Sequence, residues 1–258
     1  MPSTIFNPPP LDLELGTNEI HVWRAFLDQP ISRFHKLRQT LSMDERMRAE
    51  RLHFDQDRKR FIVGRGILRT ILGRYLNVEP SRLQFCYEKN GKPRLADKFS
   101  KVTIFFNMSD SGGVALYAFS QDGEIGVDIE KICDNPEIDR IADQFFTDRE
   151  STIYRALPES LKKESFFNCW TRKEAFIKAI GDGFSRPLDK FDVSFVPGEP
   201  AKLLSIAGDS KAASRWSIQE LESERGYAAA IAIEGRIKQL RCLQWLARDL
   251  WFNVAYSS

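Results

Sequence analysis

The sequence predicts an α+β fold built from two similarly ordered halves. Its 258 residues are enough for two compact halves, and period-two and helical patterns alternate along them. A weak internal repeat supports the doubling, because the strand pattern VALYAF at 114–119 returns about 113 positions later as YAAAIAI at 227–233. We place the boundary at the turn-like residues 121–123, which divides the chain into halves 1–121 and 122–258.

In the first half, two helical patterns interrupt the strand patterns. Ser42 followed by Glu45 is the signature of a capping box at the start of the first helix. Gly64 and Gly66 lower the helix propensity of the second but permit close packing. Asn-Gly-Lys-Pro at 90–93 predicts a turn. The expected strands are 19–26, 83–88, 102–107 and 114–119, and the expected helices are 42–53 and 56–76.

The second half begins with a strand that has one buried face. Ile125, Val127 and Ile129 alternate with small or acidic residues, so Asp128 and Glu130 point together to the other side. Helical patterns follow, and four further strand patterns close the chain. The expected helices are 137–146, 148–155 and 161–179, and the expected strands are 191–195, 216–222, 227–234 and 240–245.

Two acidic segments together indicate a magnesium site. Asp128 and Glu130 share a strand face, and Glu174 lies one helical turn before Lys178. Gathering three carboxylates at one point costs about 1–4 kcal/mol per close pair, so such a cluster implies a cation or raised pKa values. Oxygen ligands suit magnesium. The alternative for each segment alone is a solvated strand face and an ordinary surface pair on a helix.

The overall composition is that of an ordinary soluble protein. A net charge of +2 argues against nucleic acid as a partner, and no stretch approaches 18 apolar residues, which argues against a membrane. The four cysteines have no metal-site spacing, and we expect reduced thiols in a cytoplasmic protein. Basic residues crowd the segment 46–74; this predicts either a solvated helical face or a site for a polyanionic small molecule.

Several motifs in the same order resemble those of the Sfp-type 4'-phosphopantetheinyl transferases. Gly126 to Ile132, GVDIEKI, and Trp170 to Lys178, WTRKEAFIK, are similar to the two acidic signatures of that family. NGKPRL at 90–95, FNMSDSGGVALYA at 106–118 and the basic stretch at 44–61 resemble further elements. The matching elements cover roughly residues 42 to 190.

The resemblance implies an enzyme that transfers 4'-phosphopantetheine from coenzyme A to a serine of an acyl, peptidyl or polyketide carrier protein. Adenosine 3',5'-bisphosphate would be released, and the pathways served would be fatty acid, polyketide or nonribosomal peptide biosynthesis. The family fold is a pseudo-twofold pair of α/β halves with the active site in the cleft between them. The doubled organisation favours a monomer over the short type, which assembles its sites between subunits.

The resemblance also assigns roles to residues. Asp128, Glu130 and Glu174 would hold Mg²⁺ against the pyrophosphate, and Lys178 would neutralise phosphate charge. Coenzyme A would be held by a set of mostly basic residues in the first half, among which the matches of Arg46, Arg48 and Arg69 rest on basic character. That set is Arg46, Arg48, Arg60, Arg69, Lys92, Ser109 and Asp110, together with Lys178.

Two positions leave alternatives open. Glu150 resembles a glutamate proposed as the family's base for the serine proton, but it could equally be an exposed helical residue or leave the task to a metal-bound water. Asp110 stands where the family usually has His, and a carboxylate there would repel pyrophosphate unless it turns away, protonates or joins the metal shell.

Two other functions compete with the transferase. A non-catalytic coenzyme A or nucleotide-binding protein of the same fold would bind coenzyme A without modifying a carrier. A magnesium-dependent phosphohydrolase would release phosphate with no carrier present, but the sequence supplies no dedicated nucleophile or second metal site for it.

Overall fold

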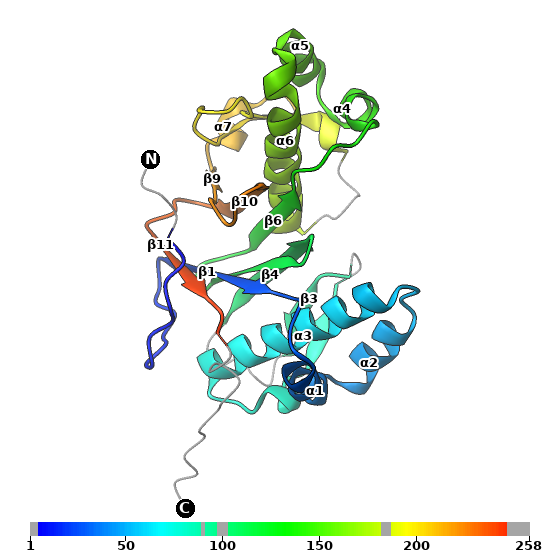
Figure 1. Ribbon diagram of the computed structural model, residues 1–258. Helices are drawn as coiled ribbons and strands as arrows, with labels where there is room; N and C mark the ends of the chain where they lie inside the picture. The colour runs from blue at the N-terminus through cyan, green and yellow to red at the C-terminus, as the bar shows by residue number, and fades with distance from the viewer. Residues whose placement is uncertain (1–4, 89–90, 97–102, 182–186, 247–258) are drawn as a thin grey trace, which may run out of the picture.

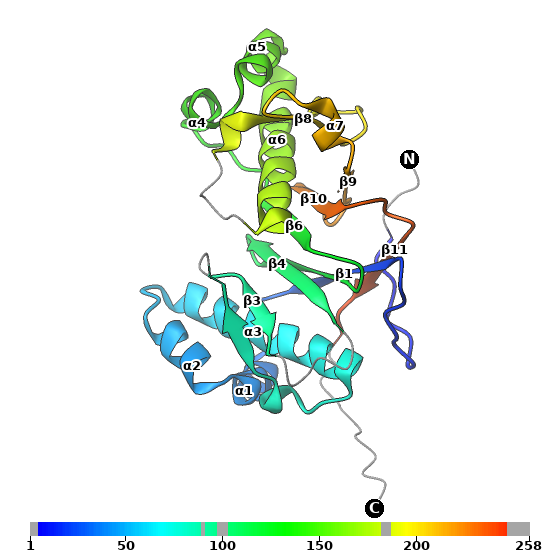
Figure 2. The same cartoon turned by 180° about the vertical axis from the view of Figure 1, so that it is seen from behind.

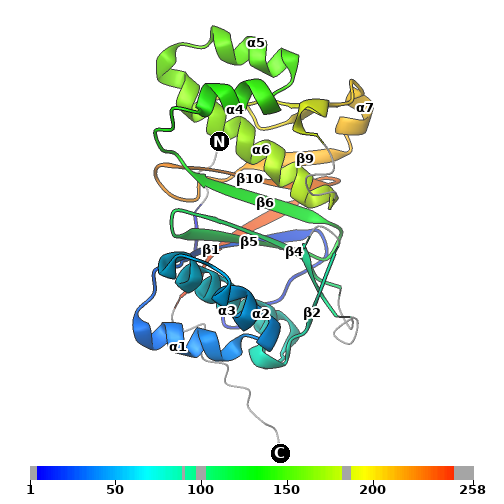
Figure 3. The same cartoon turned by 90° about the vertical axis from the view of Figure 1, so that its right-hand side faces the viewer.

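The computed structural model describes residues 5–88, 91–96, 103–181 and 187–246 (Figure 1). Two β-sheets stack face to face in the middle, and helices cover the outer face of each, as the side view shows (Figure 3). The α+β class predicted from the sequence is confirmed. Each half has one long helix on the outside of its sheet, which is consistent with the pseudo-twofold arrangement predicted from the sequence.

The first sheet has the strand order β11-β1-β5-β4. β1 pairs antiparallel with β5 and parallel with β11, so the chain returns to the first half near its C-terminus. α3 packs on the outer face of this sheet, with α1 and α2 against it (Figures 1 and 2). The elements are β1 Glu19–Phe26, α1 Ile31–Thr40, α2 Met43–Glu50, α3 Asp55–Leu76, β2 Phe85–Tyr87, β3 Pro93–Leu95, β4 Phe105–Ser111, β5 Val114–Ser120 and β11 Gln239–Gln244.

The second sheet has the strand order β6-β10-β9, and α6 crosses its outer face. A separate two-stranded sheet of β7 and β8 lies beside it. The elements are β6 Ile125–Lys131, α4 Ile138–Phe145, α5 Asp148–Ala156, α6 Glu159–Ile180, β7 Phe191–Val193, β8 Leu203–Ile206, α7 Ser210–Ala213, β9 Trp216–Glu220 and β10 Tyr227–Glu234.

Strand alternation explains how the two sheets are held together. Val127 and Ile129 of β6 and Leu116 of β5 belong to one core between the sheets. The opposite faces of the same sheets pack on α3 and α6, which form two further cores. β5 is therefore buried on both faces and reads as a continuous apolar run.

Gly126 brings α6 unusually close to β6. A Cβ atom at Gly126 would lie 2.0 Å from the carbonyl oxygen of Ala175, so only glycine fits. Asp128 and Glu130 follow Gly126 on the same face of β6. This close approach places the acidic strand directly beside the helix that carries Glu174 and Lys178.

The structure corrects several element predictions in the first half. β4 ends only at Ser111, because Ser109 and Asp110 continue the pairing with β5, and the turn is Gly112-Gly113. The second helix begins at Asp55, and the capping box of Ser42 and Glu45 is present. α1, β3, β8 and α7 were not predicted; α1 has only Leu37 fully buried, which leaves a weak helical pattern. Part of the expected turn at 90–93 and of the strand at 102–107 lies outside the described residues.

Candidate functional site

The two halves meet where the edge strands β4 and β6 lie side by side. Alternate residues of β4 face β6, and side chains rather than paired backbones join the strands. Ser109 and Ser111 therefore point at the acidic residues of the second half. The contacts are Asn107 Oδ1 accepting from Val127 N at 3.0 Å, Ser109 Oγ to Asp128 Oδ1 at 2.8 Å and Ser111 Oγ to Glu130 Oε2 at 2.8 Å.

Lys178 completes this junction from α6. Its Nζ donates to Asp128 Oδ1 at 2.6 Å and to Ser109 Oγ at 2.9 Å. Burial alone would lower the pKa of Lys178, but the charge of Asp128 and its hydrogen bond raise it above the usual value. The lysine side chain keeps 28% of its surface exposed, so a charged group can approach it from solvent.

Two carboxylate oxygens beside Lys178 lack a donor. Asp128 Oδ2 and Glu174 Oε1 are buried and have no hydrogen-bond partner among the described residues. Burial first, then the charges of Asp128 and Glu130, raise the pKa of Glu174 to about 6, against the opposing effect of Lys178. Burial and Asp128 also raise the pKa of Glu130. Buried carboxylate oxygens without donors are suited to a cation.

The chemistry of these residues fits Mg²⁺, although they do not form a closed coordination sphere. Within the described residues, no three His, Cys, Asp or Glu side chains form a ready metal-ion group. Instead the ammonium of Lys178 neutralises Asp128. The assignment of Asp128, Glu130 and Glu174 as metal ligands therefore stays a prediction.

Asp110 lies on the other face of β4 and is exposed. The surrounding protein nevertheless partly desolvates its carboxylate, which raises the pKa of Asp110, and the charges of Lys178, Arg60 and Arg65 act in the opposite direction. Asp110 is thus within electrostatic range of both the acidic junction and the arginines of α3. It turns away from β6, since alternate residues of a strand face opposite sides.

Arg65 is the candidate residue that sequence analysis missed. It is buried in α3 with Nη1 unpartnered among the described residues, and its burial lowers its pKa. The only sequence signal was an arginine surrounded by Val63, Gly64, Gly66 and Ile67, which predicts a buried charge in need of a partner. A buried guanidinium within electrostatic range of Asp110 suits an anionic ligand.

Comparisons with known proteins agree with the motifs. The family model for the "4'-phosphopantetheinyl transferase superfamily" matches residues 124–232. A second family model, "4'-phosphopantetheinyl transferase, N-terminal", matches residues 23–122. The chain is 42% identical over 228 residues to the 4'-phosphopantetheinyl transferase HetI of Nostoc sp., covering 88% of this chain and 93% of HetI. The chain belongs to the 4'-phosphopantetheinyl transferase superfamily.

Two other relatives support the same membership. A putative 4'-phosphopantetheinyl transferase of Synechocystis sp. is 33% identical, covering 80% of this chain and 81% of the relative. Sfp of Bacillus subtilis is 30% identical, covering 67% of this chain and 75% of Sfp. The expected family and its enzymatic class are confirmed. In the part of the chain that the structure describes, no helix has the length and apolar character needed to cross a membrane.

For a 4'-phosphopantetheinyl transferase, the placement of Arg69 is unexpected. Its side chain is fully buried and forms an ion pair with Glu45, with Nε 2.6 Å from the carboxylate. It also donates to the backbone carbonyls of Pro80 at 2.9 Å and Leu83 at 3.0 Å. Through these contacts Arg69 joins α3 to α2 and to the turn that follows α3, and none of them involves a residue of the acidic junction.

Lys92 also binds protein groups in this structure. Its Nζ donates to the Glu124 carboxylate at 2.7 Å and to the backbone carbonyl of Lys178 at 2.8 Å. Lys92 thereby ties the β2–β3 hairpin to the C-terminal end of α6, where a cation is favoured by the helix dipole. Arg60 is likewise engaged, by a two-point ion pair with Asp28 at 2.9 and 3.0 Å.

Glu150 is neither exposed nor beside the acidic junction. It is the N3 residue of the α5 capping box, with Thr147, and is 1% exposed. Its Oε1 accepts from Val193 N at 2.8 Å, and its Oε2 lies 2.7 Å from Nζ of the buried Lys173. Both oxygens are therefore used inside the second half.

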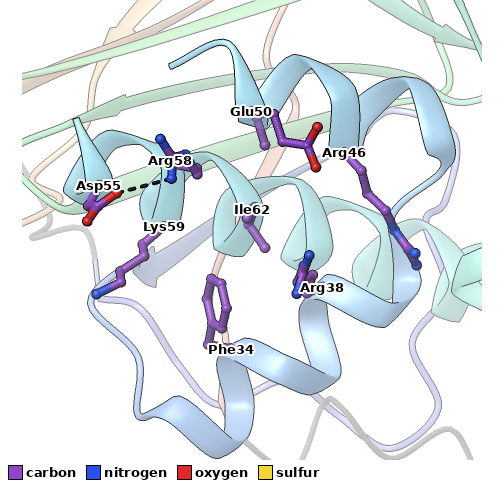
Figure 4. A pocket seen from close by; sticks show the side chains of 9 residues that line it. Phe34, Arg38, Arg46, Glu50, Asp55, Arg58, Lys59 and Ile62 are labelled. Carbon is purple, nitrogen blue, oxygen red and sulfur yellow. Dashed lines mark hydrogen bonds and ion pairs between the residues drawn. The ribbon is translucent and has the colours of Figure 1, made fainter. Parts of the chain in front are cut away.

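Arg46 and Arg48 point to different sides of α2. Arg48 lies 5.7 Å from the ring centre of Phe61, on the side of Arg65. Arg46 lines a pocket between α1, α2 and α3 (Figure 4). The structure thus brings Ser109, Lys178 and the three acidic residues together, and it separates Arg46, Arg69 and Glu150 from them.

Proposed function

We propose that this protein transfers 4'-phosphopantetheine from coenzyme A to a serine of an apo carrier protein in a magnesium-dependent reaction. The products are the holo carrier protein and adenosine 3',5'-bisphosphate. Family membership supports the transfer, and the acidic junction of β4, β6 and α6 supports the metal and the phosphate chemistry. We also propose that it acts in the cytoplasm as a monomer, because one chain supplies both strands of the junction.

The observation that carries the proposal is the pair of buried oxygens without donors, Asp128 Oδ2 and Glu174 Oε1. Leaving each such group unpaired costs about 1–3 kcal/mol of folding free energy, and the binding of a cation would offset that cost. Glu130 extends the same face. When bound, Mg²⁺ would offset charge on the pyrophosphate of coenzyme A.

Lys178 has two tasks in this proposal. It holds Asp128 and Ser109 in place through two hydrogen bonds. Because its side chain is partly exposed, it can also offer its ammonium to the phosphate at which the new bond forms, where negative charge must be neutralised. Arg65 supplies a second cation whose Nη1 has no partner among the described residues.

The serine of the carrier must lose a proton during transfer. Glu150 was predicted to accept that proton, but its position gives Glu150 a structural role. Its carboxylate is turned toward Lys173 and Val193. Whether it also accepts the serine proton is decided by substitution, as described in the Discussion.

The test is intact-mass analysis of an apo carrier protein incubated with coenzyme A and the protein, with Mg²⁺ or with EDTA. We expect a gain of one phosphopantetheine group only with Mg²⁺. No gain on acyl and peptidyl carriers, together with retained coenzyme A binding, would favour the non-catalytic binding protein. Gain in the presence of EDTA would contradict the role of the acidic junction.

A further inference from the structure

Ser111, the last residue of β4, makes two hydrogen bonds to the second half. Its Oγ donates to Glu130 Oε2 at 2.8 Å and accepts from the backbone N–H of Lys131 at 3.1 Å. A serine hydroxyl has a single hydrogen to donate, and the N–H of Lys131 occupies one of its acceptor positions. The two contacts therefore fix the direction of the hydroxyl and aim its hydrogen at the Glu130 carboxylate.

Ser109 shows the same pattern two residues earlier on the strand. Its Oγ accepts from Lys178 Nζ at 2.9 Å and donates to Asp128 Oδ1 at 2.8 Å. Each serine thus accepts from one donor of the second half and donates to one carboxylate. Because alternate residues of a strand share a face, the two serines of β4 match the two acidic residues of β6 one to one.

The turn that follows Ser111 is anchored by both halves. From the first half, the backbone N–H of Leu27 donates to the carbonyl of Gly113 at 2.8 Å. From the second half, the hydroxyl of Tyr227 donates to the carbonyl of Gly112 at 3.0 Å. The backbone beside Ser111 is therefore held in place, and its hydroxyl is a fixed donor at the end of β6.

Glu130 needs such a donor because it is half-buried near a like charge. It follows Asp128 by two residues on the same face of β6, so the two Cα atoms are about 7 Å apart. Repulsion between the two carboxylates favours rotamers that turn Glu130 away from Asp128. The hydrogen bond from Ser111 opposes this rotation, since it ties Oε2 to the first half.

Only one oxygen of each carboxylate is held in this way. Asp128 Oδ2 has no donor among the described residues, and no hydrogen bond or ion pair of Glu130 Oε1 occurs with them either. The serines thus orient Asp128 and Glu130 through one oxygen each, and the second oxygen has no protein donor. Such an arrangement suits carboxylates that bind a cation with the second oxygen.

We propose that Ser111 is a positioning residue for Glu130, whose carboxylate it holds in the orientation that binds a divalent cation together with Asp128. The inference rests on the proposed function, which calls for the cation. In this role Ser111 acts through Glu130 and not as a ligand. It adds a residue of the first half to a site whose three carboxylates all come from the second half.

The experiment compares Ser111→Ala and Ser111→Thr with the control Ser194→Ala. Ser194 makes the same two kinds of contact away from the junction, because its Oγ donates to the Pro200 carbonyl at 2.7 Å and accepts from the Lys202 N–H at 2.8 Å. Binding of Mn²⁺, a paramagnetic substitute for Mg²⁺, is titrated by electron paramagnetic resonance with and without coenzyme A. Transfer to an apo acyl carrier protein is measured separately over a range of Mg²⁺ concentrations.

We expect Ser111→Ala to weaken Mn²⁺ binding on the order of tenfold and to raise the Mg²⁺ concentration for half-maximal transfer by the same factor. Saturating Mg²⁺ should restore most of the transfer, because the cation ligands themselves are retained. Ser111→Thr keeps a hydroxyl and should restore the Mn²⁺ affinity. The control Ser194→Ala should bind Mn²⁺ like the wild-type protein.

The inference is wrong if Ser111→Ala binds Mn²⁺ as tightly as the control, or if Ser111→Thr loses as much affinity as Ser111→Ala. It is also wrong if Ser111→Ala lowers transfer equally at every Mg²⁺ concentration, since the serine would then act on the substrates or on the fold. A wild-type protein that binds no Mn²⁺ even with coenzyme A overturns it too. If the wild-type protein binds Mn²⁺ but transfers nothing, the proposed function fails, and the Mn²⁺ titration still decides the role of Ser111.

Discussion

The ammonium of Lys178 lies 2.6 Å from Oδ1 of Asp128, so a cation of the protein itself neutralises one side of the acidic junction. Ser109, from the other half, contacts both residues. The junction is therefore held together by the protein's own side chains, and Asp128 Oδ2 and Glu174 Oε1 have no hydrogen-bond donor among the described residues.

Replacing Lys178 by Met should abolish most of the transfer and weaken the fold. The loss of the ammonium leaves the buried Asp128 with Ser109 but without a positively charged partner, which should cost about 2 kcal/mol of unfolding free energy in the absence of Mg²⁺. The rate constant kcat should fall on the order of a hundredfold. Urea unfolding with EDTA and steady-state transfer measure the two effects, and Lys211→Met serves as control. Wild-type turnover in the variant would contradict the role of Lys178.

Replacing Glu174 by Gln should stabilise the metal-free protein at neutral pH while transfer is lost. The pKa of Glu174 is raised from 4.5 to about 6, so the folded state binds this proton more tightly than the unfolded chain. Stability therefore falls as pH rises from about 4.5 to about 6, by about 2 kcal/mol in total, and Gln removes this loss. Urea unfolding at pH 4.5 and 7.5 with EDTA tests it. An equal difference between the two proteins at both pH values would refute the explanation.

Replacing Asp110 by His should strengthen the interaction with coenzyme A. The exposed carboxylate of Asp110 lies within electrostatic range of Lys178, Arg60 and Arg65, whose positive charges it partly cancels. Its removal should lower the KM for coenzyme A severalfold at low salt. Asp110→Asn separates the lost charge from the added imidazole. Unchanged coenzyme A kinetics in both variants would show that Asp110 does not affect the nucleotide.

Replacing Glu150 by Gln should destabilise the second half and leave the chemistry intact. The buried Lys173 would lose its charged partner, 2.7 Å away, at a cost of about 3–5 kcal/mol. At a temperature where the variant is folded, kcat should change less than about threefold, because an indispensable base contributes about 10²–10⁴-fold. Thermal unfolding and transfer by the folded variant are compared. A hundredfold loss of kcat in folded protein would make Glu150 the base.

Replacing Gly126 by Ala should disrupt the site through backbone packing. The new Cβ would fall 2.0 Å from the carbonyl oxygen of Ala175, so α6 must move away from β6. We expect a loss of at least about 3 kcal/mol in unfolding free energy. Gly64→Ala is the matched control: its Cβ meets nothing closer than 3.6 Å, and the change should stabilise α3 by up to about 1 kcal/mol. Equal effects of the two substitutions would rule out the close approach.

Much of the fold could be predicted because its strands and helices have strong periodic patterns. β1 spans the predicted residues 19–26, and the alternation in β6 correctly separated Val127 from Asp128. α1 was missed because a helix with one fully buried residue leaves little periodicity. The end of β4 was misplaced because Ser109 and Ser111 resemble a polar loop, whereas they are polar to meet β6.

The sequence by itself determined the long helices and most of the strands, the shared face of Asp128 and Glu130, and the helical turn between Glu174 and Lys178. These features depend on local backbone periodicity, which a short stretch of residues specifies. Only the tertiary structure decided which charges are neutralised within the protein. Lys92 binds a carbonyl 86 positions away, and Arg69 binds a carboxylate 24 positions away. The partner of a charged side chain depends on which distant segments the fold brings into contact, and local sequence patterns do not contain that information.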